Sequence, residues 1–316
     1  MASRAVFVGS IVLDISISNL AAFPEPDFEF TTSSDIWHDQ PARLLPAGTA
    51  GSSAIVFATL RGECTLAGVI GKDSMGAYLT QYFEELGIST LSLDNSQTAT
   101  HTIANGLDGR RQSYFFPGSR LKLDTFIEAC KDRPLYFSGL SLVMDRPIVE
   151  PLKQLAKTAK LGGQTTVLDI GQAGPEMLNF EEIIVLDDTI DVLIGSEYEY
   201  ELVMGRSYTA ARKQLLAEYP GHVIVKRGRN GIYLDRYNKS RPVHIPGFKV
   251  DEINPIGAGD SFGGGFMAAW TNGKDIEYAC EFACAAGAVS ASNSAGPLGV
   301  NQESIYQVMQ NPRNTE

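Results

Sequence analysis

Short apolar runs alternate along most of the chain with longer segments whose apolar residues recur at the spacing of an amphipathic helix. The short runs predict strands near 134–138, 165–169, 192–195, 222–227 and 231–234, and the longer segments predict helices near 146–161, 197–204 and 208–219. Strands that alternate with helices need crossover connections, which make the strands parallel and place helices on both faces of the sheet. We therefore expect an α/β protein with a mostly parallel central sheet.

The two ends of the chain follow the same pattern, with two interruptions. They predict strands over 5–17 and 64–70, and helices over 48–62, 75–87, 258–272, 275–293 and 301–309. A polar excursion over 23–46 and an alternating run over 98–116, which has an Asp-Gly turn signal, break the pattern. These segments predict a small β lid formed by about 12–46 and 98–118. No linker-like tract divides the chain, so we expect residues 1–316 to form a single domain with this lid.

Composition excludes several classes of partner. The chain carries 26 Lys and Arg against 37 Asp and Glu, a formal charge of -11. Nucleic acids and anionic membranes attract clustered positive charge, so neither is an expected partner. The apolar run that begins at Ala5 is interrupted by Asp14 and is too short to span a membrane. Of the four cysteines only Cys280 and Cys284 lie close in sequence, and no His lies near them, which favours buried thiols in a reducing cytoplasm.

The segment over 254–266, Asn-Pro-Ile-Gly-Ala-Gly-Asp-Ser-Phe-Gly-Gly-Gly-Phe, carries the strongest chemical signal. Its proline disfavours helix, and the small residues Gly257, Ala258 and Gly259 then lead into Asp260 and a helical run. Free N–H groups at the start of a helix bind anions, and a carboxylate beside them can accept a hydroxyl proton. Phosphoryl transfer needs both kinds of group, so this loop indicates a kinase.

Two other interpretations of the loop remain open from its residues alone. Asp260 can act as a simple N-cap of the helix, which needs no ligand. A dinucleotide-binding protein is the second alternative, although no Gly-x-Gly-x-x-Gly follows the first predicted strand. A P-loop, Gly-x-x-x-x-Gly-Lys-Ser/Thr, is also absent from the sequence.

Residues 254–266 resemble the carboxyl-terminal signature of the PfkB, or ribokinase-like, family of carbohydrate kinases, usually Asp-Thr-x-Gly-Ala-Gly-Asp-x-Phe. Five further segments resemble motifs of this family and occur in the same order: 9–14, 47–54, 68–76, 196–199 and 225–231. The similarity thus runs along almost the whole chain. Six ordered similarities are far more specific than any one of them, and they favour a kinase over the two alternatives.

The resemblance implies a ribokinase-like three-layer α/β/α sandwich with a β lid, MgATP as the phosphoryl donor, and a hydroxyl of a sugar or nucleoside as the acceptor. It implies that Asp260 removes the hydroxyl proton while N–H groups of Gly257, Ala258 and Gly259 stabilise the γ-phosphoryl group. It places substrate contacts at Asp14, Gly48 and Ser52, and nucleotide contacts at Ser196, Lys226, Gly228 and Gly231. Glu199 is implied to hold Mg²⁺ through water. Pairing of two copies through the lid also follows from the resemblance.

Three positions depart from the family pattern. Ser52 stands where the family usually has an Asn that contacts substrate, and Ser196 replaces the Asn of Asn-x-x-Glu. Residues 254–255, Asn-Pro, replace an Asp-Thr pair that helps many members to hold a monovalent cation, so the sequence gives no support for such a requirement. Asp260 and its glycines are intact, which favours an active, ATP-dependent sugar kinase. A nucleoside kinase of the same fold and a non-catalytic ligand-binding relative are the alternatives.

The predicted lid gives only weak indications of the substrate. Its aromatic and basic side chains, which are suited to a base, a sugar face or an anionic group, are Trp37, His38, Arg110, Arg111, Tyr114, Phe115 and Phe116. Ordinary packing explains any one of them better than ligand binding does. The sequence therefore predicts a class of reaction without identifying the acceptor.

Overall fold

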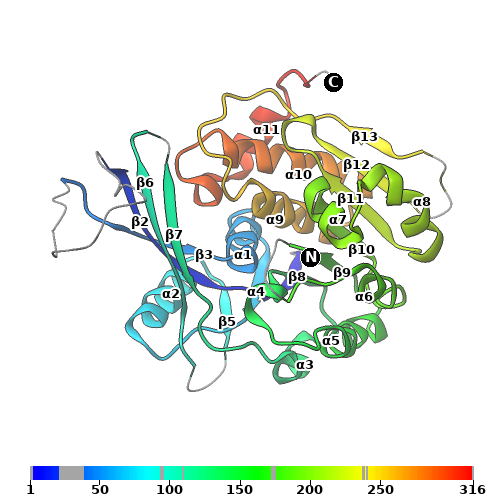
Figure 1. Ribbon diagram of the computed structural model, residues 1–316, viewed down its shortest axis with the longest axis horizontal. Helices are drawn as coiled ribbons and strands as arrows, with labels where there is room; N and C mark the ends of the chain where they lie inside the picture. The colour runs from blue at the N-terminus through cyan, green and yellow to red at the C-terminus, as the bar shows by residue number, and fades with distance from the viewer. Residues whose placement is uncertain are drawn as a thin grey trace.

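The computed structural model describes residues 3–20, 39–92, 96–108, 110–171, 176–236, 239 and 241–314. Within them the chain forms a nine-stranded central sheet, helices on both of its faces, and a separate four-stranded sheet (Figure 1). Trp37, His38 and most of the excursion over 23–46 lie outside the described residues. In the part of the chain that is described, no helix is both long enough and apolar enough to cross a membrane.

The central sheet is mostly parallel, as predicted. Its order is β13-β12-β11-β10-β9-β8-β1-β4-β5. The strands are β1 (Arg4–Gly9), β4 (Glu63–Ala67), β5 (Ser89–Leu91), β8 (Leu135–Ser138), β9 (Thr166–Asp169), β10 (Val192–Ser196), β11 (His222–Lys226), β12 (Ile232–Arg236) and β13 (Val243–Ile245). All neighbours from β11 to β5 are parallel, and β12 and β13 add an antiparallel edge. The short strands β5 and β13 escaped prediction because three residues carry little periodicity.

Two hydrophobic clusters separate the helices into two layers. Along β1, Ala5 and Phe7 join one cluster, whereas Val6 and Val8 join the other. The first cluster is covered by α1 (Thr49–Thr59), α2 (Ser74–Glu85), α9 (Ala258–Thr271), α10 (Ile276–Ala291) and α11 (Gln302–Val308). The second is covered by α3 (Ile127–Cys130), α4 (Leu140–Val143), α5 (Val149–Leu161), α6 (Phe180–Ile184), α7 (Glu197–Met204) and α8 (Tyr208–Glu218). The result is the expected three-layer α/β/α sandwich (Figure 1).

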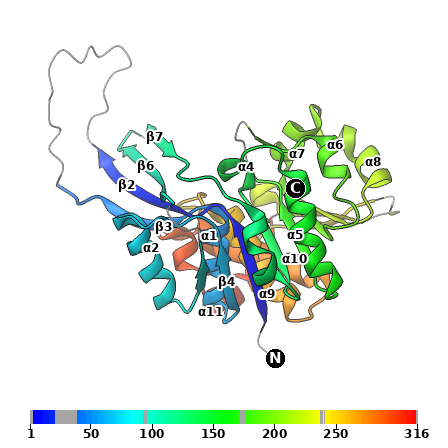
Figure 2. The same ribbon diagram turned by 90° about the horizontal axis from the view of Figure 1, so that it is seen from below.

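The lid is a four-stranded sheet of order β3-β2-β6-β7 that extends from one side of the sandwich (Figure 2). Its strands are β2 (Val12–Leu20), β3 (Arg43–Ala47), β6 (Ala99–Gly106) and β7 (Arg111–Phe116). β2 and β6 pair in parallel at the centre, and β3 and β7 pair antiparallel at the edges. The two segments expected to build the lid therefore meet in one sheet.

The single strand predicted over 5–17 is wrong as one element, because the chain divides it between two sheets. β1 ends at Gly9 in the central sheet, and β2 begins at Val12 in the lid. A Cβ on Gly9 would lie 1.7 Å from the carbonyl oxygen of Ser138, so only glycine allows β8 to approach this closely. Only Gly9 and the small residue Ser10 interrupt the apolar run here, so a periodicity argument does not detect the change of sheet.

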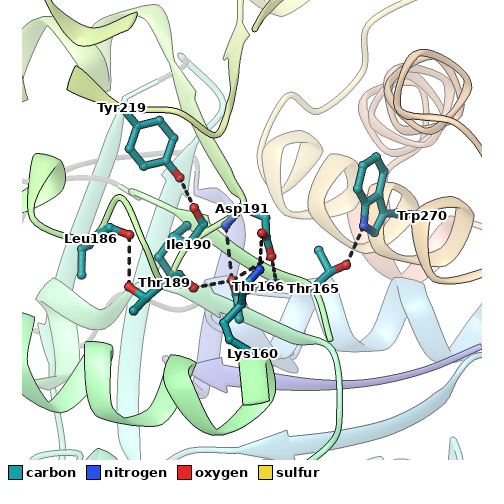
Figure 3. A network of polar contacts seen from close by, with 9 residues as sticks. All are labelled: Lys160, Thr165, Thr166, Leu186, Thr189, Ile190, Asp191, Tyr219 and Trp270. Carbon is teal, nitrogen blue, oxygen red and sulfur yellow. Dashed lines mark hydrogen bonds and ion pairs between the residues drawn. The ribbon is translucent and has the colours of Figure 1, made fainter. Parts of the chain in front are cut away.

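A polar network ties together the amino ends of β9 and β10, at the opposite end of these strands from Asp169 and Ser196 (Figure 3). The carboxylate of Asp191 accepts hydrogen bonds from Lys160 Nζ at 2.5 Å and from Thr166 N at 2.9 Å. Thr166 Oγ1 lies 2.5 Å from the carbonyl oxygen of Thr189. These bonds join α5, β9 and the segment before β10, so the network serves the fold.

Asp191→Ala is expected to lower the free energy of unfolding by about 2 kcal/mol, because it leaves a buried donor on Thr166 and a partly buried one on Lys160 without their acceptor. Urea unfolding measures this loss. Asp188→Ala is the matched control, since Asp188 is exposed and lies 3.6 Å from Lys153, a surface pair worth about 0–1 kcal/mol. Equal losses in the two variants would contradict a structural role for the network.

Candidate active site

Three polar side chains lie at one edge of the central sheet. Asp169 ends β9, Ser196 ends β10 and Lys226 ends β11. Parallel strands end at the same edge of a sheet, which is where α/β proteins bind ligands. The start of α9 lies against this edge: Lys226 Nζ is 3.5 Å from the point that a Cβ on Gly259 would occupy. The edge and the helix start together form the candidate active site.

The start of α9 has unpaired N–H groups, but Ala258, one of the predicted donors, is engaged: its N–H donates to the carbonyl oxygen of Pro255 at 3.3 Å. Gly257 is the N-cap, with φ of 81°, and no side chain caps the helix. The N–H groups of Gly259 and Asp260 make no hydrogen bond with any described residue, and this end of the helix carries partial positive charge. An anion is suited to this position. Because Asp260 is the third residue of the helix, its interpretation as the N-cap is wrong.

Asp260 lies among protein atoms and other charges. Enclosure by the protein raises the pKa of Asp260 to about 8, and the carboxylates of Asp169, Glu199 and Asp14 act in the same direction. Lys226 lowers it in part. Its own backbone is held in place, since Ser53 Oγ donates to the Asp260 carbonyl oxygen at 2.9 Å. A carboxyl with a raised pKa, beside an anion-binding helix start, is suited to accept a proton.

The lid contributes Asp14 to the same region. Asp14 is on β2, and Asp14 Oδ1 lies 3.5 Å from His101 Nδ1 on β6. Burial raises the pKa of Asp14 to about 6, and Arg111 partly lowers it. Burial together with Arg111 lowers the pKa of His101. Asp14 therefore belongs to a polar cluster on the lid, and His101 is a member of this cluster that the sequence motifs do not indicate.

Gly48 and Ser52 lie at the base of the lid, at the start of α1. Gly48 is the N-cap of α1 with φ of 88°, and a Cβ there would lie 2.5 Å from the carbonyl oxygen of Ser10. Ser52 is buried in the first turn and its N–H donates to the Gly48 carbonyl oxygen at 2.7 Å. Gly48 therefore allows the link between β1 and β2 to approach α1, and its contact with substrate stays a prediction.

Ser196 and Glu199 form a reciprocal cap on α7. Glu199 N donates to Ser196 Oγ at 3.1 Å, and Ser196 N donates to Glu199 Oε2 at 2.5 Å. The serine that replaces the family's usual Asn thus supplies a capping oxygen. Only one of the two Glu199 carboxylate oxygens bonds with described residues, so the other is available to a ligand.

One cavity of about 660 Å³ brings together every residue predicted to contact nucleotide. Its wall includes Ser196, Glu199, Lys226, Gly228, Gly231, Ala258 and Gly259. This volume lies in the range of small-molecule sites. The sequence-distant members of the predicted site are therefore neighbours in space, and the cavity opens directly onto the start of α9.

Asn314 lines this cavity, and the sequence analysis missed it. Asn314 Nδ2 donates to the carbonyl oxygen of Arg229 at 2.6 Å, and Asn314 N donates to Gly247 O at 2.8 Å. Asn314, Gly247 and Phe248 all line the cavity. No local pattern in a short polar segment indicates that it packs beside a turn more than 80 residues away, as the Asn314–Arg229 separation of 85 shows.

Comparison with known proteins gives the family. Residues 11–298 match the family described as pfkB family carbohydrate kinase. A ribokinase of Haemophilus influenzae is 24% identical over 280 residues, which cover 86% of this chain and 89% of the relative. An aminoimidazole riboside kinase of Salmonella typhimurium is 26% identical over 284 residues, which cover 84% and 85%. The crystal structure of a ribokinase from Thermotoga maritima aligns with a TM-score of 0.80 at 24% identity and covers 98% of this chain and 100% of that one.

The fold and the match over residues 11–298 define a class of protein, the ribokinase-like kinases, which are phosphotransferases with an alcohol group as acceptor. The chain belongs to the PfkB family of carbohydrate kinases. This confirms the resemblance drawn from the six motifs, and it rules out the dinucleotide-binding oxidoreductase that the loop alone left open.

Proposed function

We propose that the chain is an ATP-dependent kinase that transfers the γ-phosphoryl group to a hydroxyl of a sugar or sugar-like molecule, with Asp260 as the general base. The position of Asp260 carries this proposal. It lies beside the unpaired N–H groups of α9, between the cavity lined by Lys226 and the lid cluster around Asp14. A base in this position reaches both the transferring group and the acceptor hydroxyl.

The donor side of the reaction follows from the cavity. Its wall residues Ser196, Lys226, Gly228 and Gly231 contact the nucleotide, and the unpaired N–H groups at the start of α9 donate to γ-phosphoryl oxygens. No group of three His, Cys, Asp or Glu in the described residues builds a metal cage. One available oxygen on Glu199 fits a Mg²⁺ ion that keeps its waters and arrives with the phosphates. Such an ion neutralises charge on the phosphate oxygens.

The acceptor side lies between the lid and α9. Asp14, with contributions from Gly48 and Ser52 at the base of the lid, orients the hydroxyls of the acceptor. Asp260 takes the proton of one acceptor hydroxyl while the oxygen of that hydroxyl forms the new bond to phosphorus. The bond between phosphorus and the β,γ-bridging oxygen breaks, and ADP leaves with the electron pair.

A nucleoside acceptor is the second candidate. His101 and Phe115 make an edge contact on the same face of the lid as Asp14, with ring centroids 6.0 Å apart. An aromatic pair in that position is suited to cover a base. The names of the relatives include both a ribokinase and an aminoimidazole riboside kinase, which supports keeping both acceptor classes.

A panel of sugars and nucleosides, assayed with MgATP for ADP release and for the phosphorylated product, tests the proposal. Turnover with a sugar and none with nucleosides is the expected result. Turnover confined to nucleosides would support the second candidate. A protein that binds ATP but consumes none with any member of a broad panel would contradict the proposed function.

Pairing of two copies through the lid is part of the same proposal. Leu44 and Tyr114 lie on the lid face opposite Asp14 and are 43% and 65% exposed. Exposed apolar side chains on one face of a sheet are suited to contact with a second copy, although Leu44 and Tyr114 lie on opposite edge strands of the lid. A cytoplasmic location also stays a prediction.

Replacing K⁺ with tetramethylammonium in the assay is expected to leave kcat nearly unchanged. Asn254 puts a neutral amide where many relatives have a carboxylate, and its Oδ1 accepts a hydrogen bond from Ile256 N at 3.1 Å. A neutral oxygen that is already engaged attracts a monovalent cation weakly. Measurements at constant ionic strength separate specific activation from screening, and a large loss of kcat without K⁺ would contradict the expectation.

The pH dependence of kcat/KM is expected to rise about tenfold per pH unit below a pKa near 8 and to level off above it. The base must be ionised, and enclosure together with Asp169, Glu199 and Asp14 raises its pKa more than Lys226 lowers it. Circular dichroism over the same pH range shows whether unfolding contributes. A flat profile between about pH 6 and 9 would exclude Asp260 as the titrating base.

A further inference from the structure

Lys226 forms a buried ion pair at the bottom of the nucleotide cavity. Its Nζ lies 2.9 Å from Asp169 Oδ2, and the two side chains are 16% and 5% exposed. Removing two charges from water costs about as much as their attraction returns, so a buried pair is weak evidence of a stabilising role. The position of this pair, at the edge where β9 and β11 end beside α9, points to function instead.

Besides Lys226, two other donors hold the carboxylate of Asp169. Tyr136 OH donates to its Oδ2 at 3.1 Å, and Gly171 N donates to its Oδ1 at 3.2 Å. Tyr136 is fully buried in β8, so this donor is fixed by the core. Because both carboxylate oxygens of Asp169 accept hydrogen bonds, this side chain has a fixed orientation and holds the ammonium group of Lys226 in one position.

The ammonium group of Lys226 faces the same space as the N–H groups of α9. Lys226 lines the cavity together with Ala258 and Gly259. Its Nζ is 3.5 Å from the point that a Cβ on Gly259 would occupy. Charges on Asp169, Glu199 and Asp260 outweigh burial and raise the pKa of Lys226, so it stays protonated. A fixed positive charge and unpaired donors therefore converge on one small volume.

We propose that Lys226 is a catalytic residue whose ammonium group binds an oxygen of the γ-phosphoryl group during its transfer, and that Asp169 is the positioning residue that aims it. This rests on the proposed function. Lys226 keeps its protons throughout: the acceptor oxygen bonds to phosphorus, its proton passes to Asp260, and ADP leaves with the electrons of the broken bond. The ammonium group stabilises charge on the phosphoryl oxygens that the N–H groups of α9 also contact.

Two variants separate the catalytic role from packing. Lys226→Met keeps most of the side-chain volume and removes the charge, and it is expected to lower kcat by about 100-fold. Lys226→Met combined with Asp169→Asn leaves no uncompensated buried charge, so it keeps the measurement possible if the single variant unfolds. Lys160→Met is the control for loss of a lysine ion pair, since Lys160 pairs with Asp191 at 2.5 Å at the opposite end of the strands, in a more exposed position. The control is expected to retain kcat.

The pH profile tests the positioning role of Asp169. Lys226→Met removes a charge that lowers the pKa of Asp260, so the acid limb of kcat/KM is expected to move to higher pH. Asp169→Asn removes a charge that raises that pKa, so its acid limb is expected to move to lower pH while kcat falls. Absence of these opposite displacements would contradict the placement of both charges beside Asp260.

Binding measurements make the test independent of turnover. Isothermal titration with a non-hydrolysable ATP analogue and with ADP is expected to show that Lys226→Met weakens the triphosphate about tenfold and leaves ADP nearly unchanged, since only the triphosphate reaches Lys226. If the wild type phosphorylates no acceptor but Lys226→Met still weakens binding of the triphosphate and not of ADP, the Lys226 contact is supported and the proposed function is contradicted. If the wild type turns over an acceptor, and Lys226→Met keeps both its kcat and its affinity for the ATP analogue relative to ADP, the Lys226 proposal alone is overturned.

Discussion

Asp260→Asn is expected to lower kcat by about 1,000-fold or more while leaving the Kd for ATP nearly unchanged. The amide occupies the same volume at the third position of α9 but cannot accept the hydroxyl proton. The nucleotide contacts predicted in the cavity are untouched, because they come from β10, β11 and the turn after β11. Steady-state kinetics with the best acceptor and titration calorimetry with ATP measure the two quantities.

Asp275→Asn is the control for this change. Asp275 is the N-cap of α10, where it accepts a hydrogen bond from Tyr278 N at 2.9 Å, and it lies beyond the far end of α9. The variant removes the same formal charge and is expected to lose at most about 1 kcal/mol of stability without loss of kcat. If Asp260→Asn kept more than a tenth of the wild-type kcat, the general-base role would be wrong.

Gly257→Ala is expected to lower kcat by about 100-fold, because it moves the N–H groups that stabilise the transferring phosphoryl. Gly257 has φ of 81°, and a Cβ there would lie 2.4 Å from Pro297 Cγ and 2.6 Å from its Cδ. The helix start must shift to relieve this overlap. Rate measurements together with thermal unfolding show whether the loss of activity exceeds the loss of stability.

Gly273→Ala separates backbone strain from displacement of the anion site. Gly273 also has a positive φ, of 74°, but nothing lies within 4 Å of the position of its Cβ. Both variants carry a strain of roughly 1 kcal/mol, yet only Gly257→Ala changes the start of α9. Similar kcat values for the two variants would contradict the role given to these N–H groups.

The architecture could be predicted from local patterns because each pattern is contained in a few neighbouring residues. The buried strands β9, β10 and β11 appear as short apolar runs, and the small residues before Asp260 predict a helix start without a side-chain cap. The predicted nucleotide residues then converge because parallel strands end at one edge. These parts of the site follow from residue type and chain order.

Other parts of the site depend on which segments become neighbours, and no local pattern contains that information. Asp169 is simply the last residue of a buried strand until Lys226, 57 residues later, is placed beside it. Asn314 becomes a cavity wall only through its bonds to Arg229 and Gly247. The division of the first predicted strand at Gly9 requires the carbonyl oxygen of Ser138 to be in place.

The way the lid is connected limits how this enzyme can change its acceptor. The pair β2 and β3 is inserted between β1 and α1, the pair β6 and β7 between β5 and the first residues leading to α3, and the parallel seam of β2 with β6 joins the two insertions. Replacing one insertion alone removes the strand that pairs with the other, and leaves the edge of β2 or of β6 unpaired. With the acceptor bound as proposed on the face that carries Asp14 and His101, new acceptor preferences are accessible through single substitutions on that face, rather than through replacement of the whole lid.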